Sequence, residues 1–135
     1  MSEIRRKFLL SSDDTEYLDN AFPGWEAIDG GWILIHNFPI RPGYTVQTAT
    51  AAIQIPATYP ATRLDMVYFN PAVLRADGQP IKATQYTADI DGKPFQRWSR
   101  HYGPGEWQAN EDNIATHVMA ITDWLDRAAP SEVTP

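Results

Sequence analysis

The chain has 135 residues and a formal net charge of −6 at pH 7, with 43% hydrophobic and 21% charged residues. This length fits one domain with one hydrophobic core, and the composition is ordinary for a globular protein. The acidic balance argues against nucleic-acid binding, because contacts to phosphates need clustered Lys and Arg. The absence of cysteine excludes disulfides, cysteine-ligated zinc and thiol catalysis.

No apolar stretch approaches the roughly 20 residues that a membrane-spanning helix needs. The first residues, MSEIRRKFLLSSDD, contain only three consecutive apolar residues and do not predict a secretory signal. We therefore expect a cytoplasmic protein that has no membrane partner. The expected organisation is an N-terminal arm over residues 1–11, a single domain over residues 12–128 and a flexible tail over residues 129–135.

A short helix is the first predicted element. Residues Ser11 to Asp14 are of the types that cap helix N-termini, and the acidic ones suit the positive end of the helix dipole. Apolar residues then recur at helical spacing up to Phe22, and Pro23-Gly24 ends the run.

Four strands are predicted in short succession after this helix. Trp25–Ile28 and Trp32–Ile35 form a hairpin signal around Asp29-Gly30-Gly31. Val46–Ile55 contains β-branched and alternating apolar residues, and Leu64–Phe69 is a further apolar run. Because sequential strands with short connections usually pair with their neighbours, we expect a four-stranded antiparallel meander.

An irregular region and a second helix complete the predicted elements. Within it, Thr84–Ile90 and Phe95–His101 can pair around Asp91-Gly92 as a small hairpin. We expect Asn110 to cap a C-terminal helix whose first turn is acidic. Its apolar stripe consists of Ile114, Val118, Ile121 and Leu125. The predicted fold class is therefore α+β.

One motif lies between the third and fourth predicted strands, in IQIPATYPATRLDMVYF (Ile53–Phe69). Pro56 and Pro60 fix φ and remove backbone donors, so the chain passes between the strands through a rigid bend. The ring of Tyr59 can fill this bend. The pattern of strand, proline, Tyr-Pro and aromatic strand resembles the signature of ubiquitin-conjugating enzymes.

The resemblance extends over about residues 12–127. In ubiquitin-conjugating enzymes the nucleophilic cysteine lies eight residues before a tryptophan, and the same count from Trp107 leads to Ser99. The context WSRH (Trp98–His101) before Trp107 is similar to family E of the prokaryotic ubiquitin-conjugating-like proteins. The resemblance implies their fold, a ubiquitin-like protein and an activating enzyme as partners, and no cofactor on this subunit.

Several departures from the family pattern bear on the chemistry. The His-Pro-Asn tripeptide of the eukaryotic enzymes is missing, and Arg63-Leu64 replaces the two prolines expected after Tyr-Pro. Without cysteine, a thioester intermediate is impossible. A serine can carry an acyl group as an oxyester instead, once a base removes its proton.

Ser99 and His101 are the candidate catalytic residues. If the chain is extended here, both side chains point to the same face, because side chains alternate along a strand. Histidine is the usual general base at neutral pH. Arg97 and Arg100 flank Ser99, either as a solvated surface or as groups that steer an acidic partner or stabilise an oxyanion.

The same residues can also have purely structural roles. Ser-x-His pairs often occur by chance, and Trp98 and Trp107 are more typical of packing residues than of substrate contacts. His36 and His117 fit structural or exposed roles. Three scattered histidines without cysteine do not predict a metal site.

Three functions follow as hypotheses. The first is a ubiquitin-conjugating-like transferase that uses Ser99, with Thr84, Thr87 and Tyr102 as the next candidate hydroxyls. The second is a non-catalytic adaptor of the same fold that binds the ubiquitin-like protein or its activating enzyme. The third, an unrelated Ser/His hydrolase, lacks a Gly-x-Ser-x-Gly motif and an obvious acidic third member. By analogy of gene neighbourhood, the resemblance also suggests antiphage defence or stress response.

Overall fold

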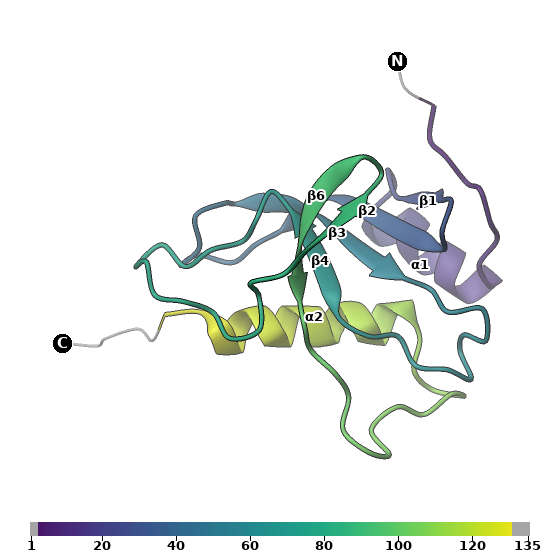
Figure 1. Cartoon of the computed structure of the whole chain (residues 1–135). Coiled ribbons are helices and arrows are strands. Elements are labelled where there is room, and N and C mark those ends of the chain that lie inside the picture. Colours follow the sequence, from purple (N-terminus) through teal and green to yellow (C-terminus); the bar gives the residue numbers. More distant parts are fainter. Residues whose placement is uncertain (1–2, 131–135) are drawn as a thin grey trace.

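The computed structural model describes residues 3–130, which form two helices and one antiparallel sheet of six strands. The strand order is β1-β2-β3-β4-β6-β5, and α2 runs along one side of the curled sheet (Figure 1). The elements are α1 (Ser12–Ala21), β1 (Glu26–Ile28), β2 (Trp32–Pro39), β3 (Thr48–Gln54), β4 (Val67–Asn70), β5 (Thr87–Ile90), β6 (Lys93–Trp98) and α2 (Ile114–Ala128). The predicted α+β class is confirmed.

The number of strands in the sheet differs from the prediction. The predicted meander corresponds to β1–β4, but β6 pairs with β4 through Val67 opposite Trp98 and Phe69 opposite Gln96. The small hairpin therefore extends the main sheet and does not stand apart from it. By pairing with β4, the hairpin satisfies backbone groups that an edge strand would leave open.

The predicted local elements near the N-terminus are present. Ser11 caps α1, because its hydroxyl accepts a hydrogen bond of 3.2 Å from the backbone N–H of Asp14. The β1–β2 hairpin turns at residues 29–31, as expected. Strand β4 begins later than predicted, at Val67, because Met66 adopts a φ of 56°, outside the extended region.

The cap of α2 is Asn113, which corrects the prediction of Asn110. The side chain of Asn113 accepts a hydrogen bond of 3.1 Å from the backbone of Thr116, and the Thr116 hydroxyl accepts one of 2.9 Å from the backbone of Asn113. The acidic residues Glu111 and Asp112 therefore precede the helix. The predicted apolar stripe is buried in full: Ile114, Val118, Ile121 and Leu125.

The sheet has apolar clusters on both faces. The main core lies between the sheet and the two helices, and it includes Leu18 from α1, Ile121 from α2 and Trp98 from β6. On the opposite face a smaller cluster contains buried residues such as Leu34 and Phe95, although neither helix contributes to it. Each fully buried side chain of this kind contributes roughly 1.5–3 kcal/mol. The curl of the sheet gives this second face its own small core.

The N-terminal arm is attached to the sheet. Residues on either side of Arg6 exchange backbone hydrogen bonds with Ala27 of β1 at 2.8 and 2.9 Å. The guanidinium of Arg5 contacts the carboxylates of Glu26 in β1 at 2.9 Å and of Asp91 in the β5–β6 turn at 2.8 Å. One arginine thus connects the two ends of the curled sheet.

The C-terminal end of the domain packs against a loop. Pro130 lies beside Gly43, where an added Cβ would be 3.0 Å from the proline ring. Residues 131–135 of the predicted flexible tail lie outside the described residues. Within residues 3–130, neither helix is long and apolar enough to cross a membrane.

Candidate functional site

Ser99 and His101 follow the end of β6, where the chain leaves the sheet and enters the long connection to α2. The backbone N–H of Ser99 donates to the carbonyl of Ala83 at 3.0 Å, and that of Met66 donates to the carbonyl of Arg100 at 2.9 Å. The segment is therefore held from both sides. The structure brings the two candidate side chains together, with 3.3 Å between Ser99 Oγ and His101 Nε2.

A carboxylate completes this contact from the other side of the imidazole. Asp65 Oδ1 lies 2.9 Å from His101 Nδ1. A carboxylate can only accept a proton from Nδ1, and in the neutral tautomer with that proton Nε2 is free to accept the proton of the Ser99 hydroxyl. The three side chains have the connectivity of a nucleophile, a base and the group that orients the base.

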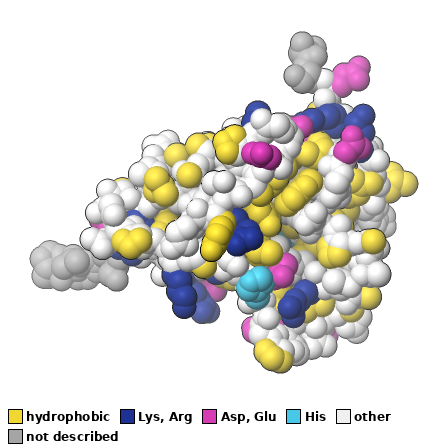
Figure 2. All heavy atoms as spheres, viewed as in Figure 1, with side chains coloured by type: hydrophobic (Ala, Val, Ile, Leu, Met, Phe, Trp, Pro, Cys, Tyr) yellow, Lys and Arg dark blue, Asp and Glu magenta, His cyan; other side chains and the backbone are white. Residues whose placement is uncertain are grey.

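The contact is open to solvent. The side chain of His101 is 51% exposed and that of Asp65 is 33% exposed. Figure 2 shows a histidine at the molecular surface with acidic and basic side chains close to it. A macromolecular substrate can therefore approach the imidazole and the hydroxyl without opening the core.

Asp65 was missed by the sequence reasoning, which found no acidic third member. It precedes β4, whereas His101 follows β6, and 36 positions separate them in the sequence. The antiparallel pairing of β4 with β6 brings the start of one strand next to the end of the other. The only signal in the sequence was an acidic residue at the edge of a predicted strand.

Arg97 and Arg100 lie beside aromatic rings. The guanidinium of Arg97 is 4.7 Å from the ring centroid of Tyr86, and its buried Nε has no hydrogen-bond partner among the described residues. The guanidinium of Arg100 is 5.1 Å from the ring of Trp98, and it donates to the backbone carbonyl of Ser99 at 3.1 Å. Within residues 3–130, neither guanidinium is hydrogen-bonded to the side chain of Ser99 or His101.

An aromatic cluster fixes the connection between β6 and α2. The hydroxyl of Tyr102 lies 2.7 Å from His117 Nδ1, and His117 Nε2 lies 2.9 Å from the carbonyl oxygen of Met66. Burial lowers the pKa of His117 to about 4, so its neutral ring donates through Nε2 and accepts from Tyr102. His117 therefore has a structural role, one of the two roles expected for it.

The remaining residues singled out by the sequence have packing or surface contacts. Trp98 is completely buried, and the indole N–H of Trp107 donates to the carbonyl of Pro60 at 2.9 Å. His36 lies 2.7 Å from the carboxylate of Glu26, away from the Ser99 contact. Among the described residues, no three His, Asp or Glu side chains are placed to hold a metal ion.

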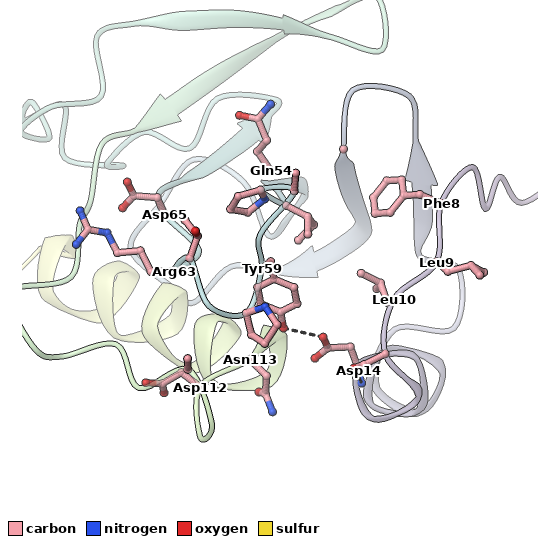
Figure 3. Close-up of a pocket in the computed structure, with 18 of the residues that line it drawn as sticks. Phe8, Leu9, Leu10, Asp14, Gln54, Tyr59, Arg63, Asp65, Asp112 and Asn113 are labelled. Carbon is pink, nitrogen blue, oxygen red and sulfur yellow. Dashed lines mark hydrogen bonds between the residues drawn. The ribbon is translucent and has the colours of Figure 1, made fainter.

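The proline-flanked bend forms one wall of a groove of about 1220 Å³. Inside it the hydroxyl of Tyr59 donates to Asp14 Oδ2 at 2.6 Å, as Figure 3 shows. The other carboxylate oxygen of Asp14 accepts from the backbone N–H of Ile114 at 3.3 Å, so the bend is tied to both helices. Asp65 also lines this groove, which therefore adjoins the Ser99–His101 contact.

The α+β fold is compatible with a ubiquitin-conjugating-like protein, and a family match shows that class directly. The family model "Prokaryotic E2 family E" matches residues 10–128, and the chain belongs to this family. No curated protein and no solved structure shows a significant match. Family membership gives the protein a role related to ubiquitin conjugation, with a ubiquitin-like protein and an activating enzyme as its general partners.

Proposed function

We propose that the protein accepts the C-terminus of a ubiquitin-like protein from an activating enzyme as an oxyester on Ser99 and transfers it to a target amine. The observation that carries this proposal is the continuous contact from Ser99 Oγ through the His101 imidazole to Asp65 Oδ1, at 3.3 and 2.9 Å. It supplies the base that an ordinary serine hydroxyl needs before it can act as a nucleophile.

Acyl transfer to the serine proceeds with His101 as base. Nε2 takes the hydroxyl proton while Ser99 Oγ forms a bond to the activated C-terminal carbonyl carbon. The bond from that carbon to the activating enzyme breaks, and the leaving group receives the proton from the imidazole. Asp65 holds the ring in the required orientation and stabilises its charged form.

Transfer to the target reverses these roles. The amine nitrogen forms a bond to the carbonyl carbon and gives a proton to His101 Nε2, the bond to Ser99 Oγ breaks, and the imidazole passes that proton to the departing serine oxygen. An oxyester is less reactive toward amines than a thioester, so this second step needs assistance. The exposure of the imidazole supports access for the amine-bearing partner.

Reconstitution with the cognate activating enzyme, its ubiquitin-like protein and ATP tests the proposal. We expect a conjugate on this chain that hydroxylamine cleaves, and we expect Ser99→Ala to abolish it. Thr48→Ala is the matched control, because Thr48 is an exposed hydroxyl on β3 that is not a candidate acceptor, and the conjugate should be unchanged. A conjugate that persists in Ser99→Ala would assign the acyl group to another hydroxyl.

An adaptor function is the alternative that the missing cysteine favours. In the same reconstitution, an adaptor would form a stable complex with the ubiquitin-like protein or the activating enzyme, and no conjugate would form on the wild-type chain. Conjugate formation on the wild-type chain therefore separates the two functions, whereas binding alone does not, since Ser99→Ala should retain the complex in either case.

Hydrolysis is a further alternative, because Asp65 supplies the acidic member of a Ser–His–Asp triad that the sequence alone did not reveal. Water would replace the amine as the acceptor of the acyl group. A ubiquitin-like substrate with a C-terminal peptide extension distinguishes this reaction. A hydrolase would release the extension without ATP, whereas the proposed transferase would leave it intact.

A further inference from the structure

A second, smaller pocket of about 470 Å³ lies between the 75–82 segment, Arg100 and the last turns of α2. Four cationic side chains line it and no acidic side chain does: Arg75, Lys82, Arg100 and Arg127. The whole chain has only 11 Lys and Arg against 17 Asp and Glu, so four of the 11 cations lie at one pocket of an acidic protein. The pocket is therefore positively charged although the chain as a whole is acidic.

Only part of this charge is neutralised within the described residues. Arg75 forms two hydrogen bonds to the carboxylate of Asp77, at 3.0 and 2.5 Å, and Arg127 lies 2.8 Å from the carboxylate of Asp123. Over residues 3–130, the ion pairs include neither Lys82 nor Arg100. Two of the four cations are thus paired with a carboxylate of the described residues, whereas Lys82 and Arg100 are not. The partial charge at the C-terminal end of α2, about half an elementary charge, offsets only part of the excess.

Arg100 is held in a fixed position at this pocket. Its NH1 donates to the carbonyl of Lys82 at 3.0 Å and to that of Ser99 at 3.1 Å, and its guanidinium lies beside the ring of Trp98. Its Nε and NH2 make no hydrogen bond to the described part of the chain. Burial lowers the pKa of Arg100, as expected for a half-buried cation without a nearby anion.

We propose that this pocket binds a phosphate group. A phosphate monoester carries about −1.5 to −2 charges at pH 7 and therefore balances the two unpaired cations, whereas one carboxylate balances only one. Guanidinium donors match phosphate oxygens in pairs. Ile81 and Trp124 provide apolar walls for the organic part of the ligand, and the volume falls within the range of about 300–1,000 Å³ for ligand pockets.

This inference does not depend on the proposed acyl transfer. None of the residues that line the pocket belongs to the contact between Ser99, His101 and Asp65. The phosphate group has two possible sources, a free phosphorylated small molecule or a phosphorylated side chain of a partner protein. Both sources present the same phosphate group to the cations, and they differ in the molecule that carries this group.

Calorimetric titration of the full chain tests the proposal, with AMP as the free probe and a phosphoserine peptide as the protein-borne probe. The same peptide with glutamate in place of phosphoserine serves as the carboxylate probe. We expect saturable one-to-one binding of a phosphorylated probe, weakened about tenfold or more in Lys82→Gln and in Arg100→Gln, because each removes a charge-assisted contact. Lys93→Gln is the control, since it removes a cation that does not line the pocket.

Stronger binding of AMP would identify a small molecule as the source, and stronger binding of the peptide would identify a partner protein. Both results support the proposal. It is overturned if neither phosphorylated probe binds saturably, if the glutamate peptide binds as tightly as the stronger phosphorylated probe, or if Lys82→Gln binds like the wild type. Because Lys82 is exposed, its substitution leaves the fold intact and decides the matter even if Arg100→Gln fails to fold.

Discussion

Asp65 determines which nitrogen of His101 faces Ser99. Its carboxylate lies 2.9 Å from Nδ1 and can only accept a proton there, and Nε2 faces the Ser99 hydroxyl at 3.3 Å. A ring without this partner could rotate or carry its proton on the other nitrogen. At the residue scale, the proposed reaction makes Asp65 a positioning residue and assigns the reacting groups to Ser99 and His101.

Asp65→Asn should slow oxyester formation by roughly 10²–10⁴-fold, the contribution of a correctly placed general base. The amide can donate to Nδ1 and would favour the tautomer that leaves Nε2 protonated. Single-turnover kinetics of conjugate formation on Ser99 measure this effect. Asp89→Asn, on the exposed side of β5, is the charge-matched control and should react at the wild-type rate. An unchanged rate in Asp65→Asn would mean that the carboxylate has no positioning role.

At the scale of single elements, α2 shows how a local motif fixes a boundary. Its apolar stripe was predictable because the spacing of Ile114, Val118, Ile121 and Leu125 follows the helical period. Its start was not, because Asn110 and Asn113 are both suitable caps. Asn113 forms the reciprocal pair of hydrogen bonds with Thr116 and is the residue at which the helix begins.

Asn113→Ala should lower the free energy of unfolding by about 0.5–2 kcal/mol, the usual contribution of a helix cap. Asn110→Ala should change it by no more than about 0.5 kcal/mol, because Asn110 is an exposed turn residue. Urea denaturation followed by circular dichroism compares the two variants. Equal losses of stability would contradict the assignment of the cap.

At the scale of the whole molecule, Arg5 connects parts of the sheet that are distant in the sequence. It contacts Glu26 in β1 and Asp91 in the β5–β6 turn, and Glu26 also lies 2.7 Å from a ring nitrogen of His36. The hydrogen bond from Arg5, together with that from His36, outweighs burial and lowers the pKa of Glu26 to about 2. The arm therefore helps to hold the curled sheet closed.

The stability that Glu26 contributes should depend on pH. Its carboxyl binds a proton less readily in the folded state, with a pKa of about 2 instead of 4.5. The contribution is therefore complete above about pH 5 and is lost as the pH falls toward about 2. Arg5→Gln should cost about 1–3 kcal/mol at pH 7 and flatten this dependence.

Urea denaturation between pH 2 and pH 7 measures the effect. Arg41→Gln is the control, because Arg41 lies 3.6 Å from Asp126, a side chain that is 57% exposed, and such surface pairs contribute at most about 1 kcal/mol. If Arg5→Gln and the wild type lose stability in parallel as the pH falls, Arg5 does not set the titration of Glu26.

The elements that were predictable depend on residues close together in the chain. The cap of α1, the turn at residues 29–31 and the stripe of α2 all follow from local spacing and local backbone preference. The bend between Pro56 and Pro60 carried the family resemblance, and the family match over residues 10–128 confirms it. Ser99 and His101 were found as a pair because they are two positions apart in the chain, although β6 ends at Trp98 and both residues follow the strand that was predicted to contain them.

The amino-acid sequence by itself determined the α+β class, the family, and a serine two residues from a histidine in a chain without cysteine. Only the tertiary structure decided that β6 pairs with β4, and this pairing brings Asp65 to His101. It likewise decided that Lys82 and Arg127 share a pocket with Arg100. Contacts of this kind depend on strand register and packing between distant segments, which the order of side chains along one strand does not specify.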